Sequence, residues 1–201
     1  MAAIISAQKI GKRFGAAPLF RDISFTVSEG DRIGIVGPNG SGKSTLLAML
    51  DGRVAPDSGE IAVRKGIRVS GVLQISEFAE GDTVRSVIDA ALDQAKVVEA
   101  ERAARQAEIL GRAGFTDLDA KAASLSGGWR KRLAIVRQLA RDPDLLLMDE
   151  PTNHLDIDGI LWLEKLIENA SFATLIVSHD RRFLESIANR IIELEIGRAH
   201  V

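Results

Sequence analysis

The sequence lacks cysteine, lacks long apolar runs and carries almost balanced charge. Without cysteine, neither a disulfide nor a thiolate metal site is possible. A net charge of −2 gives the chain no overall attraction to nucleic acid or to an anionic membrane. No apolar run approaches the roughly 18 residues that a membrane-spanning helix requires, and the N-terminus lacks the apolar core of a signal peptide. We therefore expect a cytoplasmic protein with no direct membrane insertion.

The residues that are present have the composition of a globular domain. With 201 residues, 46% of them hydrophobic and 27% charged, one domain with a sizeable core is expected. Short apolar segments alternate with segments of helical periodicity, which predicts an α/β fold with a mainly parallel sheet. The expected strands are residues 4–10, 23–27, 31–36, 59–63, 67–73, 145–148, 174–177 and 191–194, with a turn at 15–18, and the expected helices are residues 46–50, 83–110 (one or two helices) and 130–139.

A glycine-rich loop follows the third expected strand and precedes a helix. It matches the pattern G-x-x-x-x-G-K-[ST] through Gly37, Pro38, Asn39, Gly40, Ser41, Gly42, Lys43 and Ser44, followed by Thr45. Glycine lets the backbone wrap closely around phosphates, and the free N–H groups of the loop and of the helix N-terminus then face the anion. We expect Lys43 to reach the terminal phosphates of a nucleotide and the Ser44 hydroxyl to bind Mg²⁺.

Two acidic residues follow a later apolar strand. The four apolar residues 145–148 place this strand inside the sheet, and Asp149 and Glu150 come at its carboxyl end, where α/β proteins bind their ligands. Asp149 is expected to hold Mg²⁺, directly or through water. Glu150 is expected to act as the general base that polarises the attacking water.

Three further side chains each have a functional and a structural interpretation. His179 follows residues 174–177 and is either a phosphate contact or a packing or surface histidine. Gln74 follows another strand, and its amide is either a contact to Mg²⁺ or water or an ordinary polar residue. Phe14, in an early turn, either stacks on adenine or packs in the core. The phosphate loop and the acidic pair favour the functional interpretation of His179.

The segment Leu125-Ser126-Gly127-Gly128-Trp129 lies between the phosphate loop and the acidic pair, and this order of motifs resembles the ATP-binding cassette (ABC) ATPases. The resemblance covers residues 4–194. It implies a P-loop NTPase fold of the ABC type, with an antiparallel β subdomain and a small helical subdomain at about residues 76–140. It also implies roles for single residues: Phe14 as the adenine-stacking aromatic, 37–45 as Walker A, Gln74 as the Q-loop, Asp149 and Glu150 as Walker B and its catalytic glutamate, Asp156 in the D-loop and His179 as the switch histidine.

The signature residues Ser126, Gly127 and Gly128 open an expected helix, whose free N–H groups and partial positive charge suit a phosphate. In the ABC family this helix end faces the ATP held by another domain, so the resemblance implies a second ABC domain, in the same full-length chain or in a dimer. Ser126 as a helix N-cap is a compatible interpretation, because a capping serine can also donate to a phosphate. A tryptophan directly after the double glycine, Trp129, resembles the Uup-like members of the family. Its alternative role is packing on the signature helix.

The residues Thr152-Asn153-His154-Leu155-Asp156 resemble the ABC-F class, whose members are not fused to membrane domains. This class implies Mg²⁺-dependent ATP hydrolysis in translation, with the ribosome as a partner. The alternatives are the energy subunit of an ABC membrane transporter and a fragment that binds ATP without turnover. Residues 97–110 belong either to the helical subdomain or to a short ribosome-contacting arm. Residues 195–201 depart from the family and resemble the translated read-through of a sequencing adapter, so we expect the first domain of a two-domain protein.

Overall fold

The computed structural model describes residues 2–15, 17–72, 77–195 and 198–200, and within them the strands form two sheets. The antiparallel sheet has the order β2-β1-β4, with β1 (Ala3–Phe14), β2 (Ala17–Ser28) and β4 (Ser58–Val63). The larger sheet has the order β5-β6-β7-β3-β8-β9 and is parallel except for β9, which pairs antiparallel with β8. Its strands are β3 (Arg32–Val36), β5 (Val69–Val72), β6 (Leu145–Asp149), β7 (Ala173–Val177), β8 (Arg190–Glu195) and β9 (Arg198–His200).

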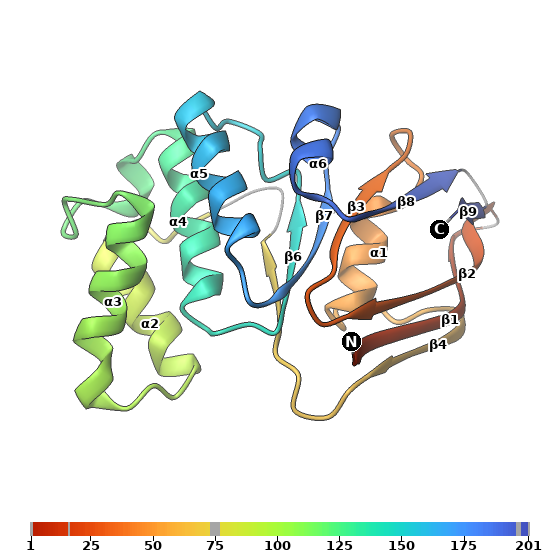
Figure 1. The fold of residues 1–201 in the computed structure, drawn as a ribbon, viewed down its shortest axis with the longest axis horizontal. Coiled ribbons are helices and arrows are strands. Elements are labelled where there is room, and N and C mark those ends of the chain that lie inside the picture. Colours follow the sequence, from red (N-terminus) through yellow and green to blue (C-terminus); the bar gives the residue numbers. More distant parts are fainter. Residues whose placement is uncertain (1, 16, 73–76, 196–197, 201) are drawn as a thin grey trace.

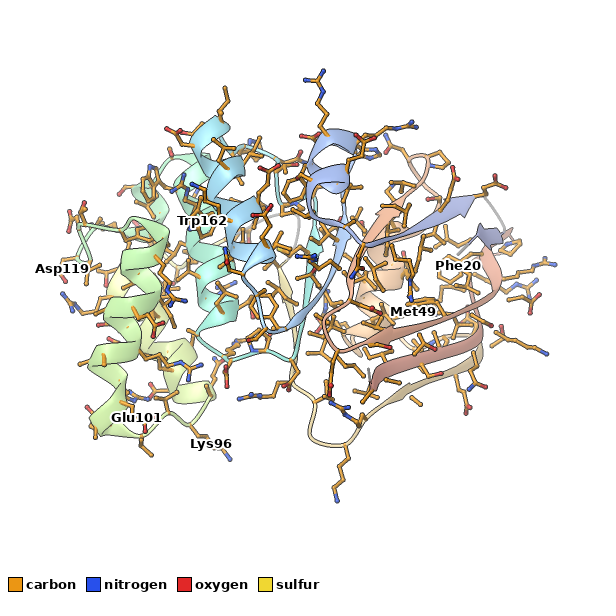
Figure 2. All side chains as sticks on the ribbon, in the orientation of Figure 1. Phe20, Met49, Lys96, Glu101, Asp119 and Trp162 are labelled. Carbon is orange, nitrogen blue, oxygen red and sulfur yellow. The ribbon has the colours of Figure 1, made fainter. Side chains whose placement is uncertain are left out.

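Helices cover both faces of the larger sheet, which explains why its central strands are apolar throughout. Every residue of β6 is buried, and its side chains alternate between two clusters. Leu145 and Leu147 join the core that contains α1 (Lys43–Leu50) and the inner face of β1 and β2. Leu146 and Met148 face α5 (Ile157–Glu168) and α6 (Arg181–Ile187) on the other side. Helix α1 therefore lies between the two sheets (Figure 1), in the core that also includes Phe20 and Met49 (Figure 2).

A group of helices forms the opposite end of the molecule from β1, β2 and β4 (Figure 1). It consists of α2 (Val84–Gln94), α3 (Glu99–Ala113), the short 3-10 helix η1 (Ala122–Ser124) and α4 (Gly127–Leu139). Thr83 begins α2 with a capping box, in which its hydroxyl accepts the Ser86 N–H and the Ser86 hydroxyl accepts the Thr83 N–H. These helices share a cluster of their own, while Ala134 and Ile135 of α4 pack into the core beside β6. Helix α4 thus joins the helical end to the sheet.

The predicted α/β fold, with a mainly parallel sheet, a separate antiparallel sheet and a set of helices, is confirmed. Residues 83–110 contain two helices, broken at residues 95–98, and α3 ends at Gly114, whose φ of 81° suits glycine. Helices α5 and α6 are not among the helices predicted from the sequence, and each directly follows motif residues. Both begin with an aspartate N-cap, Asp156 and Asp180, which is the local signal that marks them. None of the helices in the described ranges combines the length and apolar character needed to cross a membrane.

Candidate functional site

The loop between β3 and α1 has a backbone that only glycine accommodates at key positions. Gly37, Gly40 and Gly42 have φ values of 153°, 81° and 95°, which side chains rarely adopt. A Cβ on Gly37 would also lie 2.2 Å from the carbonyl oxygen of Leu194, so β8 prevents any larger residue there. Gly42 is the N-cap of α1 and provides no side chain to satisfy the first N–H groups of the helix. Those groups are therefore oriented to receive an external anion.

Lys43 is buried inside the loop and holds its first residues by hydrogen bonds. Its side-chain ammonium donates to the carbonyl oxygens of Gly37 at 2.9 Å and Pro38 at 3.0 Å, and the residue is only 7% exposed. Two residues before Lys43, Ser41 is fully buried, and its hydroxyl has no hydrogen-bond partner among the described residues. The Lys43 ammonium is held by two neutral carbonyl oxygens. Charged phosphate oxygens would accept stronger hydrogen bonds from it and could replace these carbonyls.

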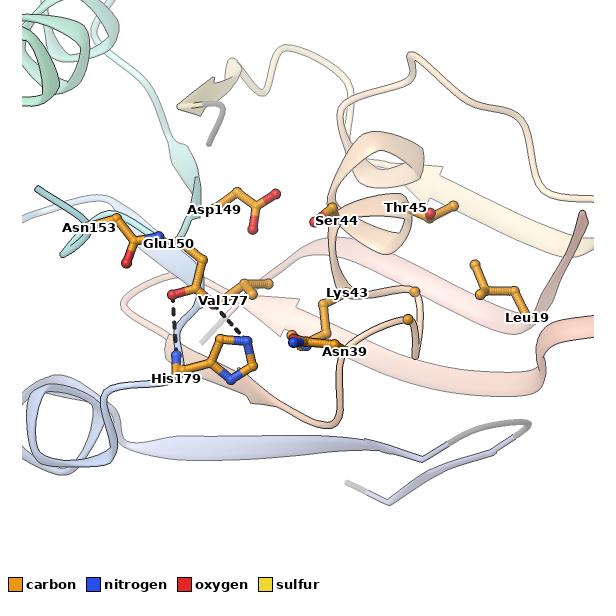
Figure 3. Close-up of a pocket in the computed structure, with 12 residues that line it drawn as sticks. Leu19, Asn39, Lys43, Ser44, Thr45, Asp149, Glu150, Asn153, Val177 and His179 are labelled. Atoms are coloured by element: carbon orange, nitrogen blue, oxygen red, sulfur yellow. Dashed lines mark hydrogen bonds and ion pairs between the residues drawn. The ribbon is translucent and has the colours of Figure 1, made fainter. Parts of the chain in front are cut away.

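The acidic pair and the histidine face Lys43 and Ser44 across a cavity (Figure 3). Asp149 ends β6, and Glu150 follows it with a φ of 46°, an uncommon value for a residue with a side chain. One Glu150 carboxylate oxygen accepts the backbone N–H of His179 at 3.3 Å. The other lies 3.4 Å from His179 Nε2. His179 reaches this place because it follows β7, the strand beside β6.

Burial determines the acidity of the Glu150 carboxyl group. Its side chain is almost enclosed, and the loss of water raises the pKa of Glu150 above the ordinary glutamate value. The contacts with His179 act in the opposite direction and are smaller. The neighbouring Asp149 raises this pKa further, and Lys43 lowers it. A carboxylate whose proton affinity is increased is a better proton acceptor at neutral pH, which is the property that a general base requires.

The cavity has a volume of about 450 Å³ and brings together most of the predicted nucleotide residues. It is lined by Leu19, Asn39, Gly40, Gly42, Lys43, Ser44, Thr45, Asp149, Glu150, Asn153, Val177 and His179. Gly37, Pro38 and Ser41 build the loop behind this surface and do not line the cavity. Gln74 lies outside the described residues, as does the side chain of Phe14, which ends β1; their roles stay predictions.

The donor set of this cavity fits Mg²⁺ in company with a nucleotide. Ser44 and Asp149 both line it and offer one hydroxyl and one carboxylate. In the described part of the chain there is no cluster of three acidic or histidine side chains that would bind a metal by itself. Magnesium usually keeps several waters and is held by one or two carboxylates together with substrate phosphates. Ser44 and Asp149 are the residues that would hold it.

The signature residues lie in a second cavity of about 520 Å³, separate from the first. It is lined by Ser126, Gly127, Gly128, Trp129, Arg132, His154, Asp156 and Asp158. Ser126 is the N-cap of α4, and its hydroxyl oxygen accepts the Trp129 N–H at a long 3.4 Å. Ser126 is therefore a helix N-cap, and its hydroxyl hydrogen could still be donated to a phosphate. The signature residues do not line the cavity that contains Lys43 and Glu150 of the same chain.

Trp129 has clear packing contacts. Its ring meets Phe115 edge-on, with centroids 5.0 Å apart, and the Arg132 guanidinium lies 4.9 Å from its centroid. The same guanidinium lies 5.2 Å from the ring of Trp162 on α5 (Figure 2). Trp129 nevertheless stays 37% exposed beside the signature cavity. The packing interpretation of Trp129 thus has direct structural support.

Several residues that line the two cavities or lie near Asp149 and Glu150 have no site role predicted from the sequence. Asn153 and His154 lie within the motif that follows Glu150, so their position was a usable signal. Leu19 is an apolar residue of β2 with no local mark of function. Lys131 of α4 is 2% exposed; burial lowers its pKa, while the charges of Asp149 and Glu150 raise it. A lysine inside a helix carries no sequence signal that it is buried near catalytic acids.

Comparison with known proteins identifies the family. Residues 20–153 match the ABC transporter family. The chain is 36% identical to the uncharacterized ABC transporter ATP-binding protein YfmR of Bacillus subtilis, over 97% of this chain and 37% of that protein. It is 34% identical to the energy-dependent translational throttle protein EttA of Mycobacterium tuberculosis H37Rv, over 98% of this chain and 41% of that protein. It is 31% identical to ABC transporter F family member 5 of Arabidopsis thaliana, over 96% of this chain and 34% of that protein.

Solved structures agree in fold. An ATP-binding subunit of an ABC transporter superposes with a TM-score of 0.89 at 20% identity, covering 98% of this chain and 90% of that one. A dimeric ATP-binding cassette in a post-hydrolysis state, bound to ADP and phosphate, superposes with a TM-score of 0.83 at 25% identity, covering 98% of each chain. The chain spans only about a third to two-fifths of the length of the curated relatives above. It belongs to the ABC transporter family and is an ABC ATPase domain.

Proposed function

We propose that this domain binds ATP with Mg²⁺ and hydrolyses it to ADP and phosphate, as one of two ABC domains in a cytoplasmic ABC-F type ATPase that acts in translation on the ribosome. One observation carries the catalytic part: Lys43 and Ser44 face Asp149, Glu150 and His179 across a single cavity. A phosphate-binding loop, a carboxylate that suits a metal and a general base are the components of phosphoryl transfer to water.

Each residue has a distinct task in this proposal. Lys43 and the N–H groups of the loop bind the phosphates, and Lys43 exchanges its two carbonyl partners for phosphate oxygens. Ser44 and Asp149 hold Mg²⁺, which neutralises charge on the phosphates when it is bound. Glu150 takes a proton from the attacking water, favoured by its raised pKa. His179 orients the Glu150 carboxylate and reaches towards the terminal phosphate. Gln74 assists at the metal, and Phe14 stacks on adenine.

The second cavity supports a second ABC domain as partner. Ser126, Gly127 and Gly128 line a cavity that contains neither Lys43 nor Glu150, so they face a nucleotide held elsewhere. The dimeric relative bound to ADP and phosphate and the greater length of the curated relatives are in keeping with such a partner. The partner domain lies in the same full-length chain or in a second copy.

The translation role rests on the relatives, which include F family members and a protein named a translational throttle. The energy subunit of a membrane transporter is the second candidate, favoured by the ABC transporter subunits among the solved structures. Fractionation of cells separates the two. Sedimentation with ribosomes in the presence of ATP supports the first role, whereas recovery with membranes and absence from ribosomes contradicts it.

Substitution of the phosphate loop and of the general base tests the catalytic proposal. Lys43→Ala should abolish ATP binding measured by calorimetry, while the exposed Lys65→Ala should leave it unchanged. Glu150→Gln should keep ATP binding, lose steady-state turnover and trap the closed two-domain state. Unchanged affinity in Lys43→Ala, or undiminished turnover in Glu150→Gln, would refute these roles.

A further inference from the structure

Resting on the proposed function, we propose that His154 belongs to the signature half of the active site. In this role its imidazole donates a hydrogen bond to the terminal phosphate of the ATP that the second ABC domain holds. His154 thus acts on the partner's nucleotide and not on the nucleotide of its own chain.

The two cavities separate His154 from its neighbour in sequence. Asn153 lines the cavity that contains Lys43 and Glu150, whereas His154 lines the signature cavity with Ser126 and Gly127. The chain therefore changes from one half-site to the other between two consecutive residues. This division assigns His154 to the half-site that does not contain its own phosphate loop.

Direct contact joins His154 to the signature glycines. A Cβ placed on Gly127 would lie 3.3 Å from His154 Cβ, 3.5 Å from Cγ and 3.9 Å from Nδ1. A Cβ placed on Gly128 would lie 2.9 Å from the His154 carbonyl oxygen. The imidazole is consequently packed beside the first N–H groups of α4. A phosphate bound at that helix end would lie within reach of both the N–H groups and the ring.

The backbone holds His154 in this place at a conformational cost. Its φ is 69°, in the left-handed region that residues with side chains rarely adopt. The turn that imposes it has a hydrogen bond from the Asn153 N–H to the Glu150 carbonyl at 3.3 Å and one from the Leu155 N–H to the Thr152 carbonyl at 3.1 Å. Strained residues of this kind are retained mainly where surrounding structure requires them, and they concentrate at binding and catalytic sites.

The charges of the signature cavity leave a role for a further donor. Asp156 and Asp158 bring two carboxylates, which repel a phosphate, against a single guanidinium on Arg132. That guanidinium is already engaged, since it lies between Trp129 and Trp162, donates to the Ala113 carbonyl at 3.3 Å and lies 3.9 Å from Asp156.

His154 can provide that donor. The side chain is exposed, and in the described part of the chain it makes no hydrogen bond. Either neutral tautomer of imidazole presents an N–H donor. His154, the Ser126 hydroxyl and the Trp129 indole N–H are thus side-chain donors that this cavity offers to an anion.

ATP-dependent association in the Glu150→Gln background tests the proposal without requiring turnover. Sedimentation velocity of the 201-residue chain with ATP and Mg²⁺ should show association. Adding His154→Ala should weaken it about a hundredfold, because the pair of chains loses two hydrogen bonds to a charged group and each is worth about tenfold. His154→Gly, which relaxes the backbone but lacks the ring, should weaken it equally, and His154→Asn, which keeps an N–H donor and tolerates a left-handed φ, should recover part of the loss. Equal association of His154→Gly and its parent would overturn the proposal.

A matched control tests whether substitution of any residue with a left-handed φ weakens association. Lys96 also has a left-handed φ, 56°, and lies in the turn between α2 and α3, outside both cavities (Figure 2). Lys96→Ala should leave association unchanged. A parent that binds ATP but never associates would contradict assembly of the site from two copies of this chain. This outcome differs from equal association of parent and His154 variants, which contradicts the role of His154 alone.

Mixing variants in the otherwise native chain decides on which nucleotide His154 acts. Lys43→Ala cannot hold ATP but has an intact signature half, whereas His154→Ala holds ATP but has a damaged one. If His154 acts on the partner's ATP, the mixture regains turnover, because the loop of the His154→Ala chain meets the intact signature of the Lys43→Ala chain. If the mixture turns over no faster than the separate variants, His154 acts within its own chain and the proposal is wrong.

Discussion

Glu150 shows how burial raises the proton affinity of a single carboxyl group. It lies directly after the last residue of β6, is 7% exposed, and has a left-handed φ that its neighbours impose. Burial opposes its charged form more strongly than His179 supports it, so its pKa is raised. The folded protein therefore binds a proton at Glu150 more readily than the unfolded chain does. The ionised residue destabilises the fold at neutral and alkaline pH.

Removing this charge should stabilise the domain. Glu150→Gln is expected to raise the melting temperature at mildly alkaline pH, because a neutral amide replaces a buried anion of the same shape. The gain should shrink as the pH falls through the raised pKa, since the native carboxyl is then protonated. Thermal unfolding at several pH values measures this, with the exposed Glu60→Gln as control. A gain that does not depend on pH would contradict the electrostatic cause.

At the scale of elements, α4 connects three parts of the molecule. Its N-terminus carries the signature, and its sides pack both into the helical end and beside β6. Lys131 lies close enough to Asp149 and Glu150 for their charges to raise its pKa against the effect of burial. Gly128, at the second position of this helix, is required by close packing and not by its backbone angle. A Cβ there would meet the carbonyl oxygen of His154, a backbone atom that cannot turn aside.

Two glycine-to-alanine substitutions in helices should therefore have opposite effects. Gly128→Ala should lower the free energy of unfolding by about 1–3 kcal/mol, the usual cost of overpacking. Gly111→Ala in α3 should raise it by about 0.5–1 kcal/mol, because a Cβ there meets nothing within 4 Å and alanine favours a helix. Urea denaturation of both variants checks the pair. Equal effects would show that the contact between Gly128 and His154 is not constrained.

At the scale of the whole molecule, the two cavities are complementary but separate. Residues of the phosphate loop, Glu150 and His179 line one cavity, and the signature lines the other. One chain therefore holds two unlike halves of an ATP site, which can be completed only by a second ABC domain in the proposed arrangement. Both tryptophans of the chain lie beside Arg132, and Trp129 lines the signature cavity, so tryptophan emission reports on this region.

Turnover by the 201-residue chain should consequently depend on its concentration. The ATPase rate per chain is expected to rise with protein concentration until association is complete, because each site needs a second copy of the domain. Tryptophan emission should change over the same range of concentration in the presence of ATP, and not in Lys43→Ala. A rate per chain that is constant across concentrations, accompanied by unchanged emission, would show that a single domain completes the site.

The sequence by itself determined the chemistry and its order along the chain. Gly37 to Ser44, Asp149, Glu150 and His179 could be predicted because each follows a strand, and the carboxyl ends of parallel strands meet at one edge of the sheet. Only the tertiary structure decided how neighbours are divided between the two cavities. It placed Leu19 beside the loop, buried Lys131 near the acids, and turned Asn153 and His154 towards different half-sites. These placements depend on packing between segments far apart in the chain and on one left-handed residue, and local sequence patterns report neither.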